Sequence, residues 1–264
     1  MTTPKPVTYS SYLQIDALLA LQTPLSEGPE HDETLFIIIH QVYELWFKQL
    51  LHELDGLERA FAAADSARAL AALKRMLTIL KTLVQQVDVI ETMTPLSFNA
   101  FRTRLEASSG FQSAQFRLLE FRLGHKRPAL LTHYPEGSSE RERLQAALAA
   151  PCAWDGFLRY LRALGWAVPA AALARDPQAP LAPDAAVQTL LIEIYRRNDF
   201  AAQVCERLVD LDEGLQEWRY RHVKMVERTL GAKPGTGGSA GADYLRATLF
   251  KPLFPDLWAI RSML

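Results

Sequence analysis

Apolar residues recur at helical spacing along most of this chain, and no segment shows the sustained alternation that a half-buried strand requires. In residues 68–91 they fall three or four positions apart, which is typical of a helix with one buried face. Residues 32–62 carry apolar side chains around most of the helical circumference, so this helix is expected to be buried on most sides. The pattern predicts an all-α protein.

Capping residues and glycines mark the expected ends of the shorter helices. Thr94 followed by Pro95 predicts a helix start, because a threonine hydroxyl can cap the first turn and proline is well tolerated at the first helical position. The Ser-Ser-Gly sequence at 108–110 predicts the end of that helix. The next helix, which begins at Phe111, is expected to stop at Gly124.

The second half of the chain reads as helices separated by polar or proline-rich connectors. Ser139 with Glu142 has the spacing of a capping box, which predicts a helix start after a loop over 125–138. Another helix is expected over 154–165, then a surface connector over 167–184 and a long helical region over 185–230, broken near Arg-Arg-Asn-Asp. These short connectors predict one domain over residues 1–264.

Composition excludes several classes of protein. Among 264 residues, 49% are apolar and the net charge is −1, without a long run of Lys or Arg, which argues against nucleic-acid binding. The two cysteines, Cys152 and Cys205, form no metal-binding or disulfide pattern. No apolar run approaches the roughly 20 residues of a membrane span, and the N-terminus lacks a signal-peptide core. We therefore expect a soluble, cytoplasmic protein.

Two of the six histidines lie in strongly helical, apolar surroundings, His40 and His222. Each could be a ligand or a core histidine whose nitrogens are satisfied by neighbours. Phe36 precedes His40 by one turn, so the two rings share a helix face that could bind a flat apolar molecule or simply belong to the core. The remaining histidines are expected in loops or on the surface: His31, His52, His125 and His133.

Arg102, four residues after Phe98, lies on an aromatic helix face. A guanidinium there is costly to bury unless an anion meets it, although an arginine that reaches solvent would need no partner. Ser109 follows at the helix end. The glycine-rich loop 231–241, which contains the hydroxyl of Thr236, does not have the residue order of a phosphate-binding loop. It is therefore interpreted as a lid over a ligand or as a plain linker.

Four blocks in this order resemble the tryptophan 2,3-dioxygenase family: HDETLFIIIHQVYELWFKQLLHELD, ETMTPLSFNAFRTRLEASSGFQSAQFRLLE, WRYRHVKMVERTLGAKPGTGGSAGADYLR and LFPDLWAIR. The opening YSSYLQIDALL extends the resemblance to the N-terminus, whereas residues 125–185 match only loosely and are expected to be a variable helical excursion. The resemblance implies an all-helical, heme-binding bundle that forms a homotetramer, a dimer of dimers, with one heme b per chain. It also implies that O2 is inserted across the indole C2–C3 bond of L-tryptophan to give N-formylkynurenine, the first step of the kynurenine pathway.

The family motifs carry roles to particular residues of this chain. The resemblance implies that His222 is the proximal ligand of the heme iron and that His40 is the distal, catalytic histidine near the indole N–H. Phe36 would pack against the indole ring. Some bacterial relatives have tyrosine where Phe98 stands, so a hydroxyl contact to the substrate carboxylate is absent here. Val87 likewise replaces a tryptophan that some members carry near the heme.

The amino-acid end of the substrate is assigned by the same motifs. Arg102 would pair with its carboxylate, and Thr236 would contact its ammonium and carboxylate groups. Ser109 would lie near heme and substrate. Tyr9 and Tyr12, within an N-terminal segment over residues 1–30, would complete the pocket of a neighbouring subunit. Two alternatives stay open: a related heme enzyme that oxidises a modified tryptophan or another aromatic amino acid, and a non-catalytic binder of heme or tryptophan.

Overall fold

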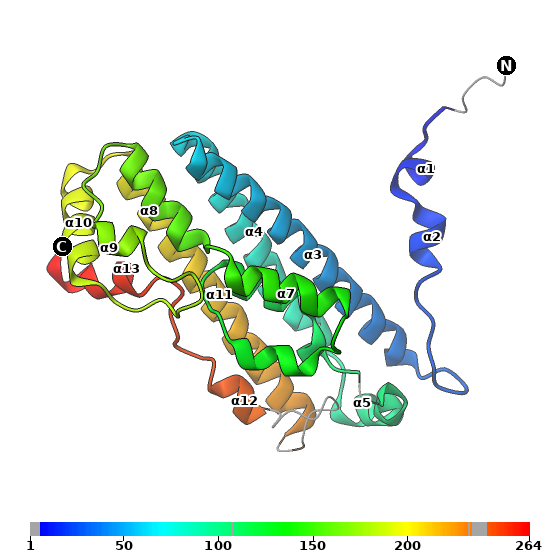
Figure 1. Ribbon diagram of the computed structural model, residues 1–264. Helices are drawn as coiled ribbons and strands as arrows, with labels where there is room; N and C mark the ends of the chain where they lie inside the picture. The colour runs from blue at the N-terminus through cyan, green and yellow to red at the C-terminus, as the bar shows by residue number, and fades with distance from the viewer. Residues whose placement is uncertain (1–5, 107, 232, 234–241) are drawn as a thin grey trace.

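The computed structural model describes residues 6–106, 108–231, 233 and 242–264 (Figure 1). Within these ranges, every regular element is an α-helix or a 3-10 helix, which confirms the predicted all-α fold class. No helix in this part of the chain is both long and apolar enough to cross a membrane.

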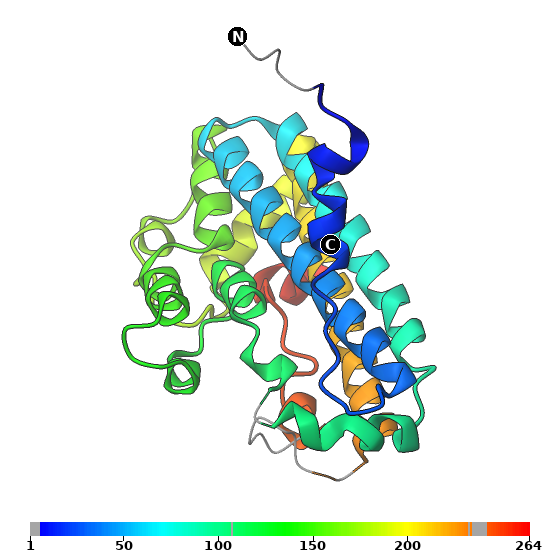
Figure 2. The same ribbon diagram turned by 90° about the vertical axis from the view of Figure 1, so that its right-hand side faces the viewer.

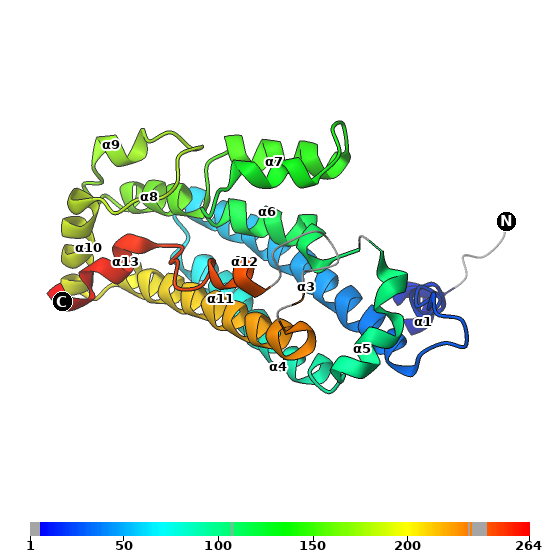
Figure 3. The ribbon, with the colours of Figure 1, turned by 90° about the horizontal axis from the view of Figure 1, so that it is seen from below.

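Three long helices form the centre of the molecule: α3 (His31–Ala62), α4 (Ser66–Ile90) and α11 (Phe200–Leu230). Helix α4 packs against both of the others, and the three run side by side along the bundle (Figures 1 and 3). The apolar stripe predicted for α4 is buried, and consists of Leu73, Met76, Leu80, Leu83, Val87 and Ile90. Burial of this stripe holds the centre together, because each fully buried Leu or Met side chain contributes roughly 1.5–3 kcal/mol.

Helices α4 and α11 approach each other closely at Gly214. A methyl group at this position would lie 3.0 Å from Leu77 Cδ1 and 3.5 Å from Leu80 Cδ1. The absence of a side chain therefore sets the distance between the two helices. Substitution by Ala would push them apart or force Leu77 into another rotamer.

A chain reversal separates α10 (Ala185–Arg197) from α11. Asn198 adopts a left-handed conformation with φ 51°, and the side chain of Asp199 accepts a hydrogen bond from the Ala201 amide at 2.8 Å. Asn and Asp suit these two positions, because asparagine tolerates a positive φ and aspartate caps a helix. The predicted break at Arg-Arg-Asn-Asp is confirmed.

The helices after α4 begin and end close to the predicted residues, with three corrections. Thr94 caps α5 (Pro95–Arg102), as predicted, but α5 ends at Arg102 and a 3-10 turn (Thr103–Leu105) follows it, well before the predicted end at 108–110. Helix α6 (Ala114–Arg122) starts later than Phe111, because a 3-10 turn (Gly110–Gln112) comes first and Ser113 then caps the α-helix. Helix α7 (Ser139–Ala149) is capped by Ser138 and not by Ser139, since the Ser138 hydroxyl accepts from the Arg141 amide at 3.2 Å.

The regions expected as connectors contain short helical turns. A 3-10 helix (Pro128–His133) lies within 125–138, and α9 (Ala170–Leu173) lies within 167–184. Between them, α8 (Ala153–Ala163) packs against α3 and buries three aromatic side chains, Trp154, Phe157 and Tyr160. The segment predicted as a variable excursion therefore contributes to the core.

The C-terminal segment is tied to the middle of α11 by one buried carboxylate. Asp212 accepts hydrogen bonds from the amides of Leu253 and Phe254, at 2.8 and 3.1 Å, and from Trp258 Nε1 at 2.8 Å. These contacts hold the start of α13 (Pro255–Ala259) and the 3-10 turn that follows it (Ile260–Met263) beside α10 and α11.

The N-terminal arm, residues 6–25, stands away from the bundle in Figure 1, and Figure 2 shows it in front of the bundle. It contains two short helices, α1 (Tyr9–Leu13) and α2 (Ile15–Leu19), in which Tyr9 and Tyr12 are 77% and 76% exposed. The arm joins the bundle at the buried Glu33, whose carboxylate accepts from the amides of Leu25 and Ser26, at 2.6 and 3.0 Å. Many of the aromatic and aliphatic side chains of the arm are therefore exposed to solvent and not packed in a hydrophobic core.

Candidate functional site

A cavity of about 230 Å³ lies at the end of the bundle where α3, α5, α6 and α11 meet. Its wall is mostly apolar and aromatic, as is usual for a site that binds an organic ligand. Five of the residues predicted to form the site line it: Phe36, His40, Phe98, Ser109 and His222. The structure therefore brings together residues that are up to 186 positions apart in the sequence.

His40 is held in one orientation by its own helix. Its Nδ1 lies 2.7 Å from the carbonyl oxygen of Phe36, one turn earlier on α3. A carbonyl only accepts hydrogen bonds, so Nδ1 carries the proton and Nε2 keeps a lone pair. Burial lowers the pKa of His40 and outweighs the opposing effects of this carbonyl and of Glu44. His40 is therefore a neutral acceptor in the cavity wall.

Aromatic rings surround His40 on one side. The Phe36 ring lies 4.1 Å from the imidazole between centroids, and it also packs against Phe98 at 5.8 Å and Phe101 at 5.6 Å. The helix face predicted from the spacing of Phe36 and His40 is thus confirmed as part of a cavity. It offers one hydrogen-bond acceptor next to an apolar surface.

His222 enters the cavity from α11. Its ring stacks on Trp218, one turn earlier, with centroids 5.2 Å apart and an interplanar angle of 7°. Burial is the main cause that lowers the pKa of His222 to about 4, and the nearby His40 and the charge of Arg117 act in the same direction. The imidazole is therefore neutral at physiological pH, which is the form that ligates a metal.

An arginine cluster, consisting of Arg117, Arg127, Arg219 and the carboxylate of Glu120, forms the polar end of the cavity. Glu120 accepts from Arg117 at 2.6 Å, from Arg127 at 2.6 Å and from Arg219 at 2.7 Å. Burial opposes ionisation of Glu120, but the three guanidinium charges outweigh it and lower the pKa of Glu120 to about 2. The cluster itself therefore carries a net positive charge, which Glu44, the other carboxylate in the cavity wall, partly offsets.

Arg219 retains a donor that no described residue accepts. Its side chain is only 4% exposed, and Nη1 is buried without a hydrogen-bond partner in the part of the chain that the structure describes. Arg117, Glu120 and Arg219 all line the cavity. Because an unsatisfied buried guanidinium is costly, the wall suits a ligand that is flat and apolar over most of its area and anionic at one edge.

His125 lies in the connector that follows α6, in line with the predicted loop, but its side chain is half-buried and not on the surface. Its Nδ1 is 2.9 Å from Arg219 Nη2, which can only donate, so this nitrogen accepts. Burial and the charge of Arg219 lower the pKa of His125 to about 4. The burial of His125 could not be predicted, because its partner Arg219 lies 94 residues away in the sequence. His31, His52 and His133 are exposed, as predicted.

The titration of His125 predicts a change of stability with pH. The folded protein keeps His125 neutral down to about pH 4, whereas the unfolded chain takes up its proton near the ordinary value of 6.5. We therefore expect His125 to lower the free energy of unfolding progressively between pH 6.5 and 4, and to have no further effect below that range.

Urea denaturation of His125→Gln, which keeps an acceptor but does not titrate, measures this effect. The variant should lose less of its stability than the unchanged protein between about pH 7 and about pH 4.5, the window in which the unfolded chain binds the extra proton. Equal losses in the two proteins would contradict the assignment of His125. Glu120 acts in a lower window, because its folded-state pKa lies at about 2.

The other predicted site residues are placed less closely around the cavity. Ser109 lines it and caps a 3-10 turn, since its hydroxyl accepts from the Phe111 amide at 3.3 Å. Arg102 is partly buried in the last turn of α5 but is not among the described residues that line the cavity. Thr236 lies outside the described residues. Tyr9 and Tyr12 stand on the exposed arm, away from the cavity of their own chain (Figure 1).

Sequence reasoning missed the polar end of the cavity. Arg117 and Glu120 are three positions apart on α6 and could have been recognised as a helical ion pair. Nothing in the sequence pairs Glu120 with Arg219, 99 residues later. Glu44 also lines the cavity, and its carboxylate accepts a hydrogen bond from Gln115 Nε2 at 2.8 Å.

Comparison with known proteins identifies the family of this chain. The sequence profile of the tryptophan 2,3-dioxygenase family matches residues 3–144 and 170–264. The chain is 61% identical over 256 residues to the tryptophan 2,3-dioxygenase of Herpetosiphon aurantiacus, covering 97% of this chain and 98% of that protein. It is also 61% identical over 262 residues to that of Anaeromyxobacter sp. strain K, covering 98% and 96%.

More distant relatives match over the same length, for example the tryptophan 2,3-dioxygenase of Caulobacter vibrioides, 42% identical with 98% of each chain covered. The family profile omits residues 145–169, which include α8, in line with the loose resemblance predicted for the middle of the chain. Matches of this identity and coverage establish kinship, and the chain belongs to the tryptophan 2,3-dioxygenase family.

Proposed function

We propose that this chain is a heme-dependent dioxygenase that inserts both atoms of O2 across the C2–C3 bond of the indole of L-tryptophan and so produces N-formylkynurenine. This is the entry reaction of the kynurenine pathway of tryptophan degradation. One observation carries the proposal: two neutral imidazoles, from α3 and α11, line a single apolar cavity whose far end is cationic. Membership of the family supports the same reaction.

The residues of the cavity fit a b-type heme, one per chain. His222 would be the iron ligand, because its imidazole is neutral and is braced by Trp218. Arg117 and Arg219 would meet the two carboxylates of the porphyrin, and the unpartnered Nη1 of Arg219 supports this fit. When bound, the heme iron supplies the oxygen chemistry, with O2 as co-substrate.

The residues around His40 would bind and orient the indole. Phe36 and Phe98 provide an apolar surface of the right size for a flat bicyclic ring. His40 Nε2 would accept the indole N–H, because Nδ1 is already occupied by the Phe36 carbonyl. Fixing the ring in this way aligns C2 and C3 for reaction, which lowers the barrier by removing wrong orientations.

The amino-acid end of the substrate would be held by Arg102 and Thr236, with Ser109 nearby. An arginine can bind a carboxylate with two parallel hydrogen bonds, a geometry that lysine cannot reproduce. Arg102 lies one turn after Phe98 on α5, next to the apolar wall. Phe98 carries no hydroxyl, so a neutral hydrogen bond worth about 1 kcal/mol is missing compared with relatives that have tyrosine there.

Arg102→Ala is expected to weaken binding of L-tryptophan at least about tenfold, because a charge-assisted ion pair is lost. Binding of indole or of 3-methylindole should change less than about threefold, because neither ligand has a carboxylate whose hydrogen bonds could be lost. Spectroscopic titration of the heme-loaded protein with each ligand measures both effects. Equal losses for all three ligands would show that Arg102 acts on the fold and not on the carboxylate.

The proposed assembly is a cytoplasmic homotetramer, arranged as a dimer of dimers of one-domain chains. The exposed aromatic and aliphatic side chains of the arm support it, because a monomer would leave them in water. Tyr9 and Tyr12 would contribute to the pocket of a neighbouring subunit.

A turnover experiment tests the function directly. The purified protein is loaded with heme, reduced, and mixed with O2 and L-tryptophan; we expect O2 consumption and a product heavier than tryptophan by two oxygen atoms. Ring-substituted tryptophans and other aromatic amino acids tried in parallel separate the main proposal from an enzyme of modified tryptophans. No O2 uptake by the reduced, heme-loaded protein with any of these substrates would contradict the proposal and favour a non-catalytic binder.

A further inference from the structure

Three consecutive residues, His125, Lys126 and Arg127, connect α6 to the 3-10 turn that follows it, and all three make buried or partly buried contacts. His125 meets Arg219 at 2.9 Å, and Arg127 meets Glu120 at 2.6 Å. The first of these residues therefore contacts the arginine cluster, and the third belongs to it. The middle residue contacts a different part of the molecule.

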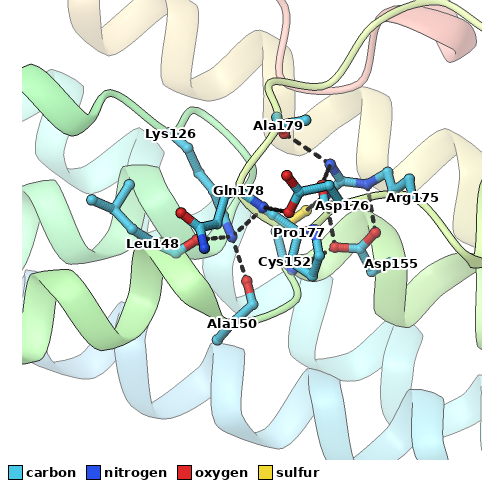
Figure 4. Close-up of polar contacts among 10 residues, drawn as sticks. All are labelled: Lys126, Leu148, Ala150, Cys152, Asp155, Arg175, Asp176, Pro177, Gln178 and Ala179. Carbon is cyan, nitrogen blue, oxygen red and sulfur yellow. Dashed lines mark hydrogen bonds and ion pairs between the residues drawn. The ribbon is translucent and has the colours of Figure 1, made fainter.

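Lys126 is a buried cation held by main-chain carbonyls (Figure 4). Its side chain is 4% exposed, and Nζ donates to the carbonyl oxygens of Leu148 at 2.9 Å, of Pro177 at 2.7 Å and of Ala150. An ammonium has three N–H groups, so its donors are all used. The three acceptors come from two separate segments of the chain.

The position of the acceptors explains why a lysine is stable here without a carboxylate of its own. Leu148 and Ala150 lie at the C-terminal end of α7, where the last carbonyls have no partner within the helix. The negative end of the helix dipole also favours a cation at this place. Lys126 thus fastens the 125–127 segment to a rigid corner that is formed by the end of α7 and the loop at Pro177.

We propose that Lys126 is a positioning residue for the arginine cluster, and through it for the carboxylates of the bound porphyrin. The inference rests on the proposed function, since it assumes that heme is the ligand of the cavity. Lys126 touches neither Glu120 nor Arg219; it holds His125 and Arg127, which do. Without this anchor the 125–127 segment shifts, so the guanidinium of Arg219 loses its contact with His125, and Glu120, its other partner, loses its contact with Arg127.

The same corner provides a matched control. Arg175 binds Asp155 with two parallel hydrogen bonds, at 2.6 and 2.8 Å, and the Ala179 carbonyl at 2.8 Å. Figure 4 shows that this fork lies beside the Lys126 site, on the same loop. Arg175→Met therefore loosens the same loop, but Lys126 keeps its acceptors Leu148 and Ala150 at the end of α7, so the 125–127 segment stays anchored.

The test compares the affinities of each apoprotein for ferric heme and for heme dimethyl ester. The ester contains the same iron porphyrin, which a histidine can ligate in the same way, but it lacks the two negative charges of the carboxylates. The unchanged protein should prefer heme at least about tenfold, because charge-assisted hydrogen bonds to the carboxylates are strong. Arg219→Gln should remove most of this preference. Lys126→Met should lower it at least about threefold, and Arg175→Met should leave it within about twofold of the unchanged protein, because only the former disturbs hydrogen bonds to the carboxylates.

Each outcome decides one point. Lys126→Met with an unchanged preference, but with a lower melting temperature like that of Arg175→Met, would overturn the inference and leave Lys126 a structural anchor only. If the unchanged protein binds heme and heme dimethyl ester equally well, the inference is also overturned. The proposed function then still stands, because the protein binds heme. An unchanged protein that binds neither porphyrin would contradict the proposed function. Should Lys126→Met fail to fold, Lys126→Gln, which keeps two donors, makes the same comparison and should show a smaller loss.

Discussion

His222→Ala is expected to abolish tight heme binding, with the affinity falling at least about 100-fold, because loss of groups that only support a metal ligand already costs about 10–100-fold. The Soret band of the purified protein should be lost or strongly reduced. The protein itself should stay folded: Trp218 and Val223 keep α11 in the core without the imidazole, so circular dichroism should show the same helical content.

The control for this prediction is His52→Ala, which removes an exposed histidine from α3 and should leave the Soret band unchanged. Added imidazole should restore part of the heme binding of His222→Ala, since it can occupy the space of the lost ring. A His222→Ala protein with an unaltered Soret band would show that the iron ligand lies elsewhere and that His222 is a core histidine.

His40→Ala should retain heme but lower kcat at least about tenfold, because the hydrogen bond that orients the indole is lost while the iron ligand remains. The expected selectivity is more diagnostic than the rate. L-tryptophan methylated at the indole nitrogen offers no N–H to His40, so the unchanged protein should strongly prefer L-tryptophan, and the variant should lose most of that preference.

Steady-state O2 consumption with both substrates measures this effect. His40→Gln, whose side-chain oxygen can accept a hydrogen bond, should lie between the two proteins. A variant that keeps both its rate and its preference would mean that His40 only packs against Phe36.

The fold and the apolar half of the site could be predicted because they depend on residues that are close together in the sequence. Helix periodicity places Phe36 and His40 one turn apart, and the structure sets their rings 4.1 Å from each other. The break at Asn198 follows from the conformational freedom of one residue type. The start of α7 is off by one residue because Ser138 and Ser139 can both cap a helix, and the start of α6 is off by three because a 3-10 turn precedes Ser113.

The polar half could not be predicted, because its partners come from distant parts of the chain. Glu120 and Arg219 each look like ordinary helical surface residues until α6 and α11 are brought together. The same holds for the burial of His125, because its partner Arg219 lies 94 residues further along the chain. The resemblance to a family assigned single residues to roles, yet a cluster defined by mutual contacts required the three-dimensional structure.

Asp212 has a consequence for how the protein can be handled. It lies ten residues before His222 on the same helix, about 15 Å along the axis at about 1.5 Å per residue. Three of its four hydrogen-bond donors come from residues 253–258, and the fourth is Gln216 Nε2 on its own helix. Proteolytic loss of that short tail would leave the carboxylate of Asp212 with Gln216 alone and loosen the helix that carries the proposed iron ligand. A degraded preparation would then be colourless although every residue proposed to touch the cofactor is still present.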